Sequence, residues 1–135
     1  MLKSGCINPE IMKVLSLCGH GDKILIADGN YPLDSKSGNA YKVYLGLSAG
    51  IPTVTQVLEA LLCNITVEKA EVMTTGDGTV PEIFAEFTDR LNGMELSTIE
   101  HDDFYGVCSE ECVRLAISTG EKRTYANILL TVGVS

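Results

Sequence analysis

The sequence predicts a single three-layer α/β/α domain, in which helices cover both faces of a mixed sheet. Segments with apolar residues at helical spacing alternate with short apolar runs typical of strands. The chain has 135 residues, a length that suits one hydrophobic core. Because no repeat or linker interrupts it, the predicted domain spans residues 1–135.

The first half of the chain predicts one helix and two strands. Asn8 and Pro9 form a helix start, with Asn8 as the N-cap and Pro9 in the first turn. Residues 23–27 form a continuous apolar run after Lys23, which predicts a strand buried on both faces. Residues 29–39 are rich in Gly, Asn, Pro and Ser and predict a loop, and residues 41–47 predict the second strand.

The second half continues the same alternation. Its apolar patterns predict, in order, a helix from Pro52, a strand over 67–74, a helix from Pro81, a strand over 96–100, a helix over about 109–119 and a strand over 128–132.

Composition argues against several classes of partner. The formal net charge is −8, the ten Lys and Arg are dispersed and Trp is absent, so nucleic acid is not an expected partner. No apolar run approaches the roughly 18 residues of a membrane span. The first five residues contain no secretion signal, so we expect a cytoplasmic protein without a membrane partner.

The five cysteines are not spaced as a disulfide framework, and the odd number suits free thiols in a reducing compartment. Cys108 and Cys112 are four residues apart and could share a helix face. A zinc site needs further ligands, and none has suitable spacing. We therefore expect structural thiols, and neither a metal nor a cofactor.

Candidate chemistry lies at both ends of the 23–27 strand. His20 precedes it and can exchange a proton near neutral pH, although a histidine after a helix is also typical of a C-cap or surface residue. Asp22 can support His20 by orienting it, or can simply solvate a turn. Asp28 follows the apolar run, and a buried carboxylate needs a partner. His101 likewise follows a predicted strand, and strand ends are where open α/β sheets bind ligands.

A further group precedes the last strand. Tyr125 and Asn127, on either side of Ala126, offer a phenol and an amide that suit a polyhydroxylated ligand. The alternative is a turn with a packed tyrosine. The sequence contains no P-loop, G-x-S-x-G, H-E-x-x-H or dinucleotide fingerprint.

Together these motifs resemble the ribose pyranase and L-fucose mutarotase family (RbsD/FucU) over nearly the whole chain. The matching segments are Gly19-His20-Gly21-Asp22, Ala27-Asp28 with Pro32, Gly50-Ile51-Pro52 with Gln56-Val57-Leu58, Thr119-Gly120-Glu121, Tyr125-Ala126-Asn127-Ile128-Leu129-Leu130, and Gly133-Val134.

The resemblance implies an RbsD-like fold and a mutarotase that opens and recloses a monosaccharide ring without cofactor or metal. His20 matches the catalytic proton donor of the family. The sugar-binding positions matched are Asp28, His101, Tyr125, Ala126 through its backbone, and Asn127. The resemblance also implies a homo-oligomer, commonly a decamer of two pentameric rings with sites where subunits meet.

Some residues of the matching segments resemble family members that act on L-fucose, and others resemble those that act on D-ribose. Gly21, Asp22 and the run over residues 27–32 resemble the fucose type, whereas His101 and Ala126 resemble the ribose type. The expected activity is an L-fucose mutarotase, with a D-ribose pyranase as the alternative. A non-catalytic sugar-binding module, and a metal-dependent enzyme using the two histidines with Asp22 and Asp28, are further hypotheses.

Overall fold

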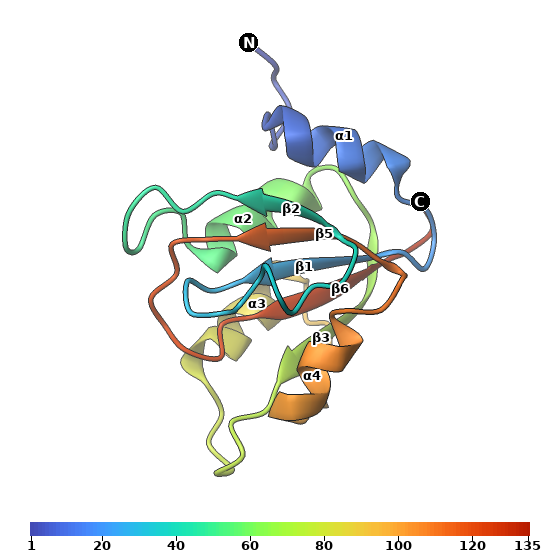
Figure 1. Cartoon of the computed structure of the whole chain (residues 1–135). Helices are drawn as coiled ribbons and strands as arrows, with labels where there is room; N and C mark the ends of the chain where they lie inside the picture. Colours follow the sequence, from blue (N-terminus) through green and yellow to red (C-terminus); the bar gives the residue numbers. More distant parts are fainter.

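The computed structural model describes residues 1–135 and contains one six-stranded sheet in the order β2-β5-β1-β6-β3-β4 (Figure 1). β6 is antiparallel to its neighbours β1 and β3, and the other pairs are parallel. The strands are β1 (Lys23–Ala27), β2 (Tyr41–Tyr44), β3 (Val67–Met73), β4 (Ser97–Ile99), β5 (Val113–Ser118) and β6 (Ile128–Val132).

Four helices accompany the sheet: α1 (Pro9–Leu17), α2 (Val54–Leu62), α3 (Glu82–Arg90) and α4 (His101–Val107). The Asn8 side chain caps α1 as predicted, accepting from the backbone N–H of Ile11. Thr53 and Gln56 form a capping box at the start of α2. None of these helices is long and apolar enough to cross a membrane.

Both faces of the sheet are covered. One core cluster joins α1, α2 and α3 to side chains that include Ile24 and Ile26 of β1. The other joins Leu25 and Ala27 of β1 to Phe104 of α4 and to Leu33 in the loop after β1. In Figure 1, α2 and α3 accordingly lie behind the sheet and α4 lies in front of it. The predicted α/β fold with a mixed sheet is confirmed, although its second helical layer is only the short α4 and a loop.

The helix predicted over 109–119 is wrong. Residues 113–118 form β5, which lies between β1 and β2. Val113, Leu115 and Ala116 are all buried, because a central strand of this sheet is covered on both faces. The prediction failed because the apolar residues of such a strand also match helical spacing. The helix in this region is the earlier α4. Cys108 is its C-cap, and Cys112 lies beyond it in the turn before β5, so the two do not share a helix face.

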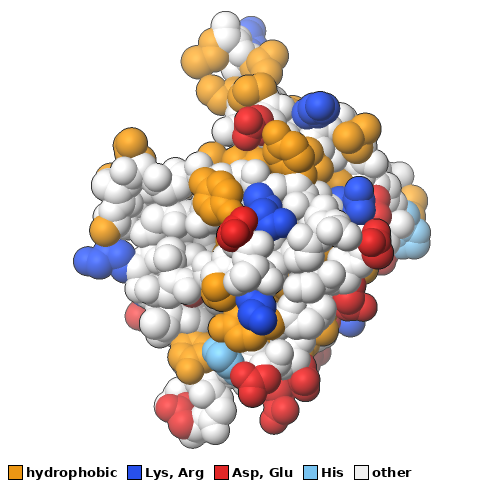
Figure 2. Space-filling view, viewed as in Figure 1, with side chains coloured by type: hydrophobic (Ala, Val, Ile, Leu, Met, Phe, Trp, Pro, Cys, Tyr) orange, Lys and Arg blue, Asp and Glu red, His pale blue; other side chains and the backbone are white.

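The remaining elements occur where predicted, with ends that differ by up to three residues. On the face drawn in Figure 2, Lys and Arg side chains are scattered, and acidic side chains gather at the lower edge, where Figure 1 places α4. The first turn of α4 carries the exposed Asp102 and Asp103. This surface has no basic stripe of the kind that binds nucleic acid.

Candidate functional site

Asp28 directly follows β1, is only 2% exposed, and is fixed by the segment that precedes β6. Its Oδ2 accepts from the backbone N–H of Ala126 at 3.1 Å, and its Oδ1 accepts from the backbone N–H of Asn30 at 2.9 Å. The backbone N–H of Asp28 donates to the side-chain oxygen of Asn127 at 2.8 Å. Because β1 and β6 are antiparallel neighbours, the residue after β1 meets the residues before β6.

The pKa of Asp28 is raised above its ordinary value. Burial is the largest cause, and it outweighs opposing hydrogen bonds from three backbone N–H groups and from the side chain of Asn127. The Asp28 carboxylate therefore has a fixed orientation, and its hydrogen bonds do not fully offset the cost of burying its charge. This combination is found at ligand-binding sites.

Tyr125 adopts a left-handed backbone conformation with φ of 58°. A non-glycine residue rarely occupies this region, and such strain concentrates at functional sites. The turn places the tyrosine ring beside His101, with ring centroids 6.2 Å apart, and leaves the next N–H on the Asp28 carboxylate. The left-handed conformation of Tyr125 thus places this segment in contact with both His101 and Asp28.

His101 is the first residue of α4 and is separated from the end of the edge strand β4 by one residue, Glu100. Its Nε2 lies 3.3 Å from the hydroxyl of Tyr105, one helical turn on, and its Nδ1 lies 3.1 Å from a carboxylate oxygen of Asp102. The ring is therefore held on both sides by residues of its own helix.

These groups surround a cavity of about 200 Å³. Its lining consists of Asp28, Asn30, Tyr31, Met73, His101, Tyr105, Thr124, Tyr125 and Asn127. The structure thus brings together four of the side chains predicted from sequence, and Ala126 contributes its backbone N–H. Tyr105 was missed, although four residues after His101 it shares a helix face with it once α4 is recognised.

The cavity suits a small neutral ligand with several hydroxyl groups. Its volume is below the roughly 300–1,000 Å³ of sites for drug-sized ligands. A carboxylate, an amide, an imidazole and phenols supply hydrogen-bond donors and acceptors. No Lys or Arg lines it, so nothing there would neutralise a phosphate.

His20 does not border this cavity. It lies in the turn before β1, whereas Asp28 lies after β1, and a strand of that length spans roughly 16 Å. The His20 side chain is 59% exposed, and its Nε2 lies 3.0 and 3.1 Å from the two carboxylate oxygens of Glu68. Asp22 does not bond the imidazole; its carboxylate accepts from the backbone N–H of Gly19 at 2.8 Å and closes the turn.

The donors of the hypothetical metal site are likewise divided between the two ends of β1. No group of three or more His, Cys, Asp or Glu side chains comes together in a way that could hold a metal ion.

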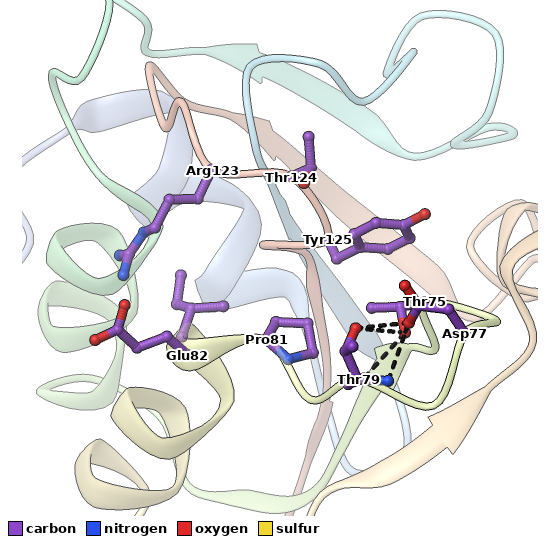
Figure 3. Close-up of a pocket in the computed structure, with 9 residues that line it drawn as sticks. Thr75, Asp77, Thr79, Pro81, Glu82, Arg123, Thr124 and Tyr125 are labelled. Atoms are coloured by element: carbon purple, nitrogen blue, oxygen red, sulfur yellow. Dashed lines mark hydrogen bonds between the residues drawn. The ribbon is translucent and has the colours of Figure 1, made fainter.

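A second cavity of about 390 Å³ adjoins the first and shares Thr124 and Tyr125 with it (Figure 3). On one side, the carboxylate of Asp77 accepts from the hydroxyls of Thr75 and Thr79. On the other side lie Arg123 and Glu82, the first residue of α3.

The charge of Arg123 is already used inside the protein. Its guanidinium donates to the carboxylates of Glu86 and the buried Glu121. Arg123 is therefore part of a structural ion pair and is not free to bind an anionic ligand.

The chain is similar over its full length to known sugar enzymes. The model of the RbsD / FucU transport protein family matches residues 1–135. A D-ribose pyranase of Geobacillus kaustophilus is 30% identical over 135 residues, covering 100% of this chain and 96% of the relative.

Two solved structures share the fold. Bacillus subtilis RbsD complexed with D-ribose has a TM-score of 0.86 and 28% identity, covering 100% of this chain and 99% of that one. The fucose mutarotase of Streptococcus pneumoniae in complex with L-fucose has a TM-score of 0.85 and 25% identity with the same coverage. This chain belongs to the RbsD / FucU transport protein family.

Proposed function

We propose that this protein is an isomerase that interconverts the cyclic forms of a free monosaccharide, with residues 1–135 acting as one sugar mutarotase domain in the cytoplasm. The observation that carries this proposal is the cavity at the end of β1, which the fixed carboxylate of Asp28 lines together with His101 and Tyr125. Its size and neutral polar lining match a free sugar, and the relatives include a D-ribose pyranase and a fucose mutarotase.

The proposed reaction is a balanced proton exchange. A base takes the proton of the anomeric hydroxyl, the bond between the anomeric carbon and the ring oxygen breaks, and an acid protonates that oxygen to give the open aldehyde. Closure reverses these steps on the other face of the carbonyl, or through another hydroxyl. Asp28, His101, Tyr125, the backbone of Ala126, and Asn127 would hold the sugar, and His20 would donate the proton.

His20 must then come from a second copy of the chain. Within one copy, β1 separates it from Asp28, and its exposed ring is available to a neighbour. A contact between two different surfaces of identical chains repeats around an axis, and it forms a ring when the rotation closes. We therefore propose a ring-shaped homo-oligomer with the site between subunits, and the resemblance to the family implies that it is a decamer of two pentamers.

Two sugars are the candidate substrates. The Gly19-His20-Gly21-Asp22 segment favours L-fucose, which is the expected substrate. His101, and the D-ribose pyranase at 30% identity over the whole chain, favour D-ribose as the second candidate.

The test is NMR exchange spectroscopy between the anomers and ring forms of L-fucose and D-ribose. Wild-type protein, His20→Ala and a sample without protein are compared at equal sugar concentration. The proposal predicts faster exchange of at least one sugar, lost in His20→Ala although the sugar still binds. Binding without acceleration by the assembled wild-type protein would replace it with a non-catalytic sugar-binding module.

A further inference from the structure

We propose that Glu68 is a positioning residue, which holds His20 in one tautomer and directs its Nδ1 to the sugar. This inference rests on the proposed function, because it assigns a role to the group that would exchange the proton.

The contact between the two side chains is close and specific. Both carboxylate oxygens of Glu68 lie within 3.1 Å of Nε2 of His20, and no other side chain hydrogen-bonds the ring. An ionised carboxylate accepts hydrogen bonds and cannot donate them. Nε2 therefore carries the hydrogen, and Nδ1 is the nitrogen left without a protein partner.

The backbone holds these two residues together through the end of β6. The turn that carries His20 is tied to Val132, whose carbonyl accepts from the N–H of Gly21 at 2.9 Å. The start of β3, which carries Glu68, is tied to the next residue, Gly133, whose N–H donates to Thr66 at 2.8 Å. Both anchors are backbone hydrogen bonds, so the two backbone segments that carry these side chains are held next to each other.

Gly133 also makes room for this arrangement. A Cβ at this position would lie 3.1 Å from Cβ of Glu68, closer than ordinary van der Waals contact. The absence of a side chain therefore lets the glutamate lie against the end of β6, within reach of the imidazole.

This arrangement has a direct chemical consequence. With Nε2–H bonded to Glu68, the proton that His20 donates to the ring oxygen must leave Nδ1 of the imidazolium, and the neutral imidazole that remains can take up the next proton only at Nδ1. The Glu68 carboxylate keeps the same hydrogen bond in both states. A carboxylate that orients a histidine in this way prevents the unproductive tautomer, as in the Ser-His-Asp triad.

The experiment compares wild type, Glu68→Ala and Glu59→Gln, each as the assembled protein. Glu59 is a matched control because it is an exposed glutamate in an ion pair, with Arg90 at 2.9 Å, away from His20. For Glu68→Ala we expect the maximal exchange rate to fall about tenfold, the size of loss typical when the partner orienting a functional histidine is removed. The KM should change less than twofold, and Glu59→Gln should match wild type.

A spectroscopic measurement separates positioning from structural support. Solid-state NMR of protein labelled with ¹⁵N-histidine distinguishes a protonated from an unprotonated ring nitrogen, and the chain has only two histidines. We expect His20 to carry its hydrogen on Nε2 in wild type and in Glu59→Gln, and to lose this preference in Glu68→Ala. An unchanged tautomer in Glu68→Ala would overturn the proposal.

The double variant His20→Ala/Glu68→Ala tests whether Glu68 acts through His20. If Glu68 acts through His20, the double variant is no slower than His20→Ala, whereas additive losses would contradict the proposal. If wild-type protein accelerates no sugar, the proposed function fails, but the tautomer measurement still reports whether Glu68 positions His20.

Discussion

His20 and Asp28 lie beyond opposite ends of the five-residue strand β1. Asp28 borders the cavity together with His101 and Tyr125, whereas His20 is exposed and paired with Glu68. A small sugar held by Asp28 cannot reach His20 of the same copy. If His20 donates the proton, as proposed, each site must therefore contain residues of two subunits.

Replacing Asp28 by Asn should weaken sugar binding by about tenfold or more, because hydrogen bonds to a charged group contribute about 1.5–3 kcal/mol. Isothermal titration calorimetry with L-fucose and D-ribose measures the effect. Asp34→Asn, an exposed change in the loop after β1, is the control and should bind as wild type. Equal affinity in Asp28→Asn would remove this carboxylate from the site.

The raised pKa of Asp28 predicts how its contribution to stability depends on pH. Above the unfolded value of about 3.9, the folded state retains the proton more strongly than the unfolded state. Ionisation of Asp28 therefore lowers the free energy of unfolding as the pH rises above about 3.9. Urea denaturation between pH 3.5 and 7 should show Asp28→Asn gaining stability relative to wild type as pH increases, and a difference that shrinks with pH would contradict the assignment.

Arg123→Ala should lower the free energy of unfolding by about 2 kcal/mol at pH 7, since it leaves the buried carboxylate of Glu121 without its charged partner. Burial alone raises the pKa of Glu121, but the hydrogen bonds from Arg123 outweigh it and hold the pKa below its ordinary value. This stabilisation is present above about pH 4.5 and is lost as the pH falls below it.

Chemical denaturation of Arg123→Ala at several pH values measures both effects. Arg114→Ala serves as the control, because Arg114 is exposed and bonds only to Glu111 at the surface. A loss for Arg123→Ala that stays constant down to pH 3 would show that the ion pair is not its cause.

Gly120→Ala should destabilise the fold by about 3 kcal/mol or more, because a Cβ there would overlap the backbone carbonyl oxygens of Ser48 and Ile51. Gly106→Ala is the matched control: it lies in α4, its Cβ would meet nothing within 4 Å, and a helical alanine is favoured by about 0.5–1 kcal/mol. Thermal unfolding of the two variants should therefore move in opposite directions. A Gly120→Ala protein as stable as wild type would show that this loop can move away.

The strands β1 and β6 were predictable from sequence because continuous apolar runs describe strands buried on both faces. The same property led to the wrong prediction of a helix at β5, because the apolar residues of this strand also fit a helical period. The short helix α4, with its acidic first turn, was not predicted. Asp28 and His101 were predictable as residues at strand ends. The hydrogen bond from Ala126 to Asp28 was not, because it depends on the antiparallel register of β1 and β6, nor was the His20 pair with Glu68, 48 residues away.

The most direct measurement is complementation between two impaired variants, His20→Ala and Asp28→Asn, assayed at a sugar concentration too low to saturate Asp28→Asn. The two are unfolded together, refolded as mixed oligomers, and compared with each variant refolded alone, with native mass spectrometry to verify mixing. If each site takes His20 from one copy and Asp28 from another, random equal mixing restores about a quarter of wild-type sites, and mutarotase activity returns accordingly. Mixed oligomers that stay as inactive as the separate variants would contradict a site shared between subunits.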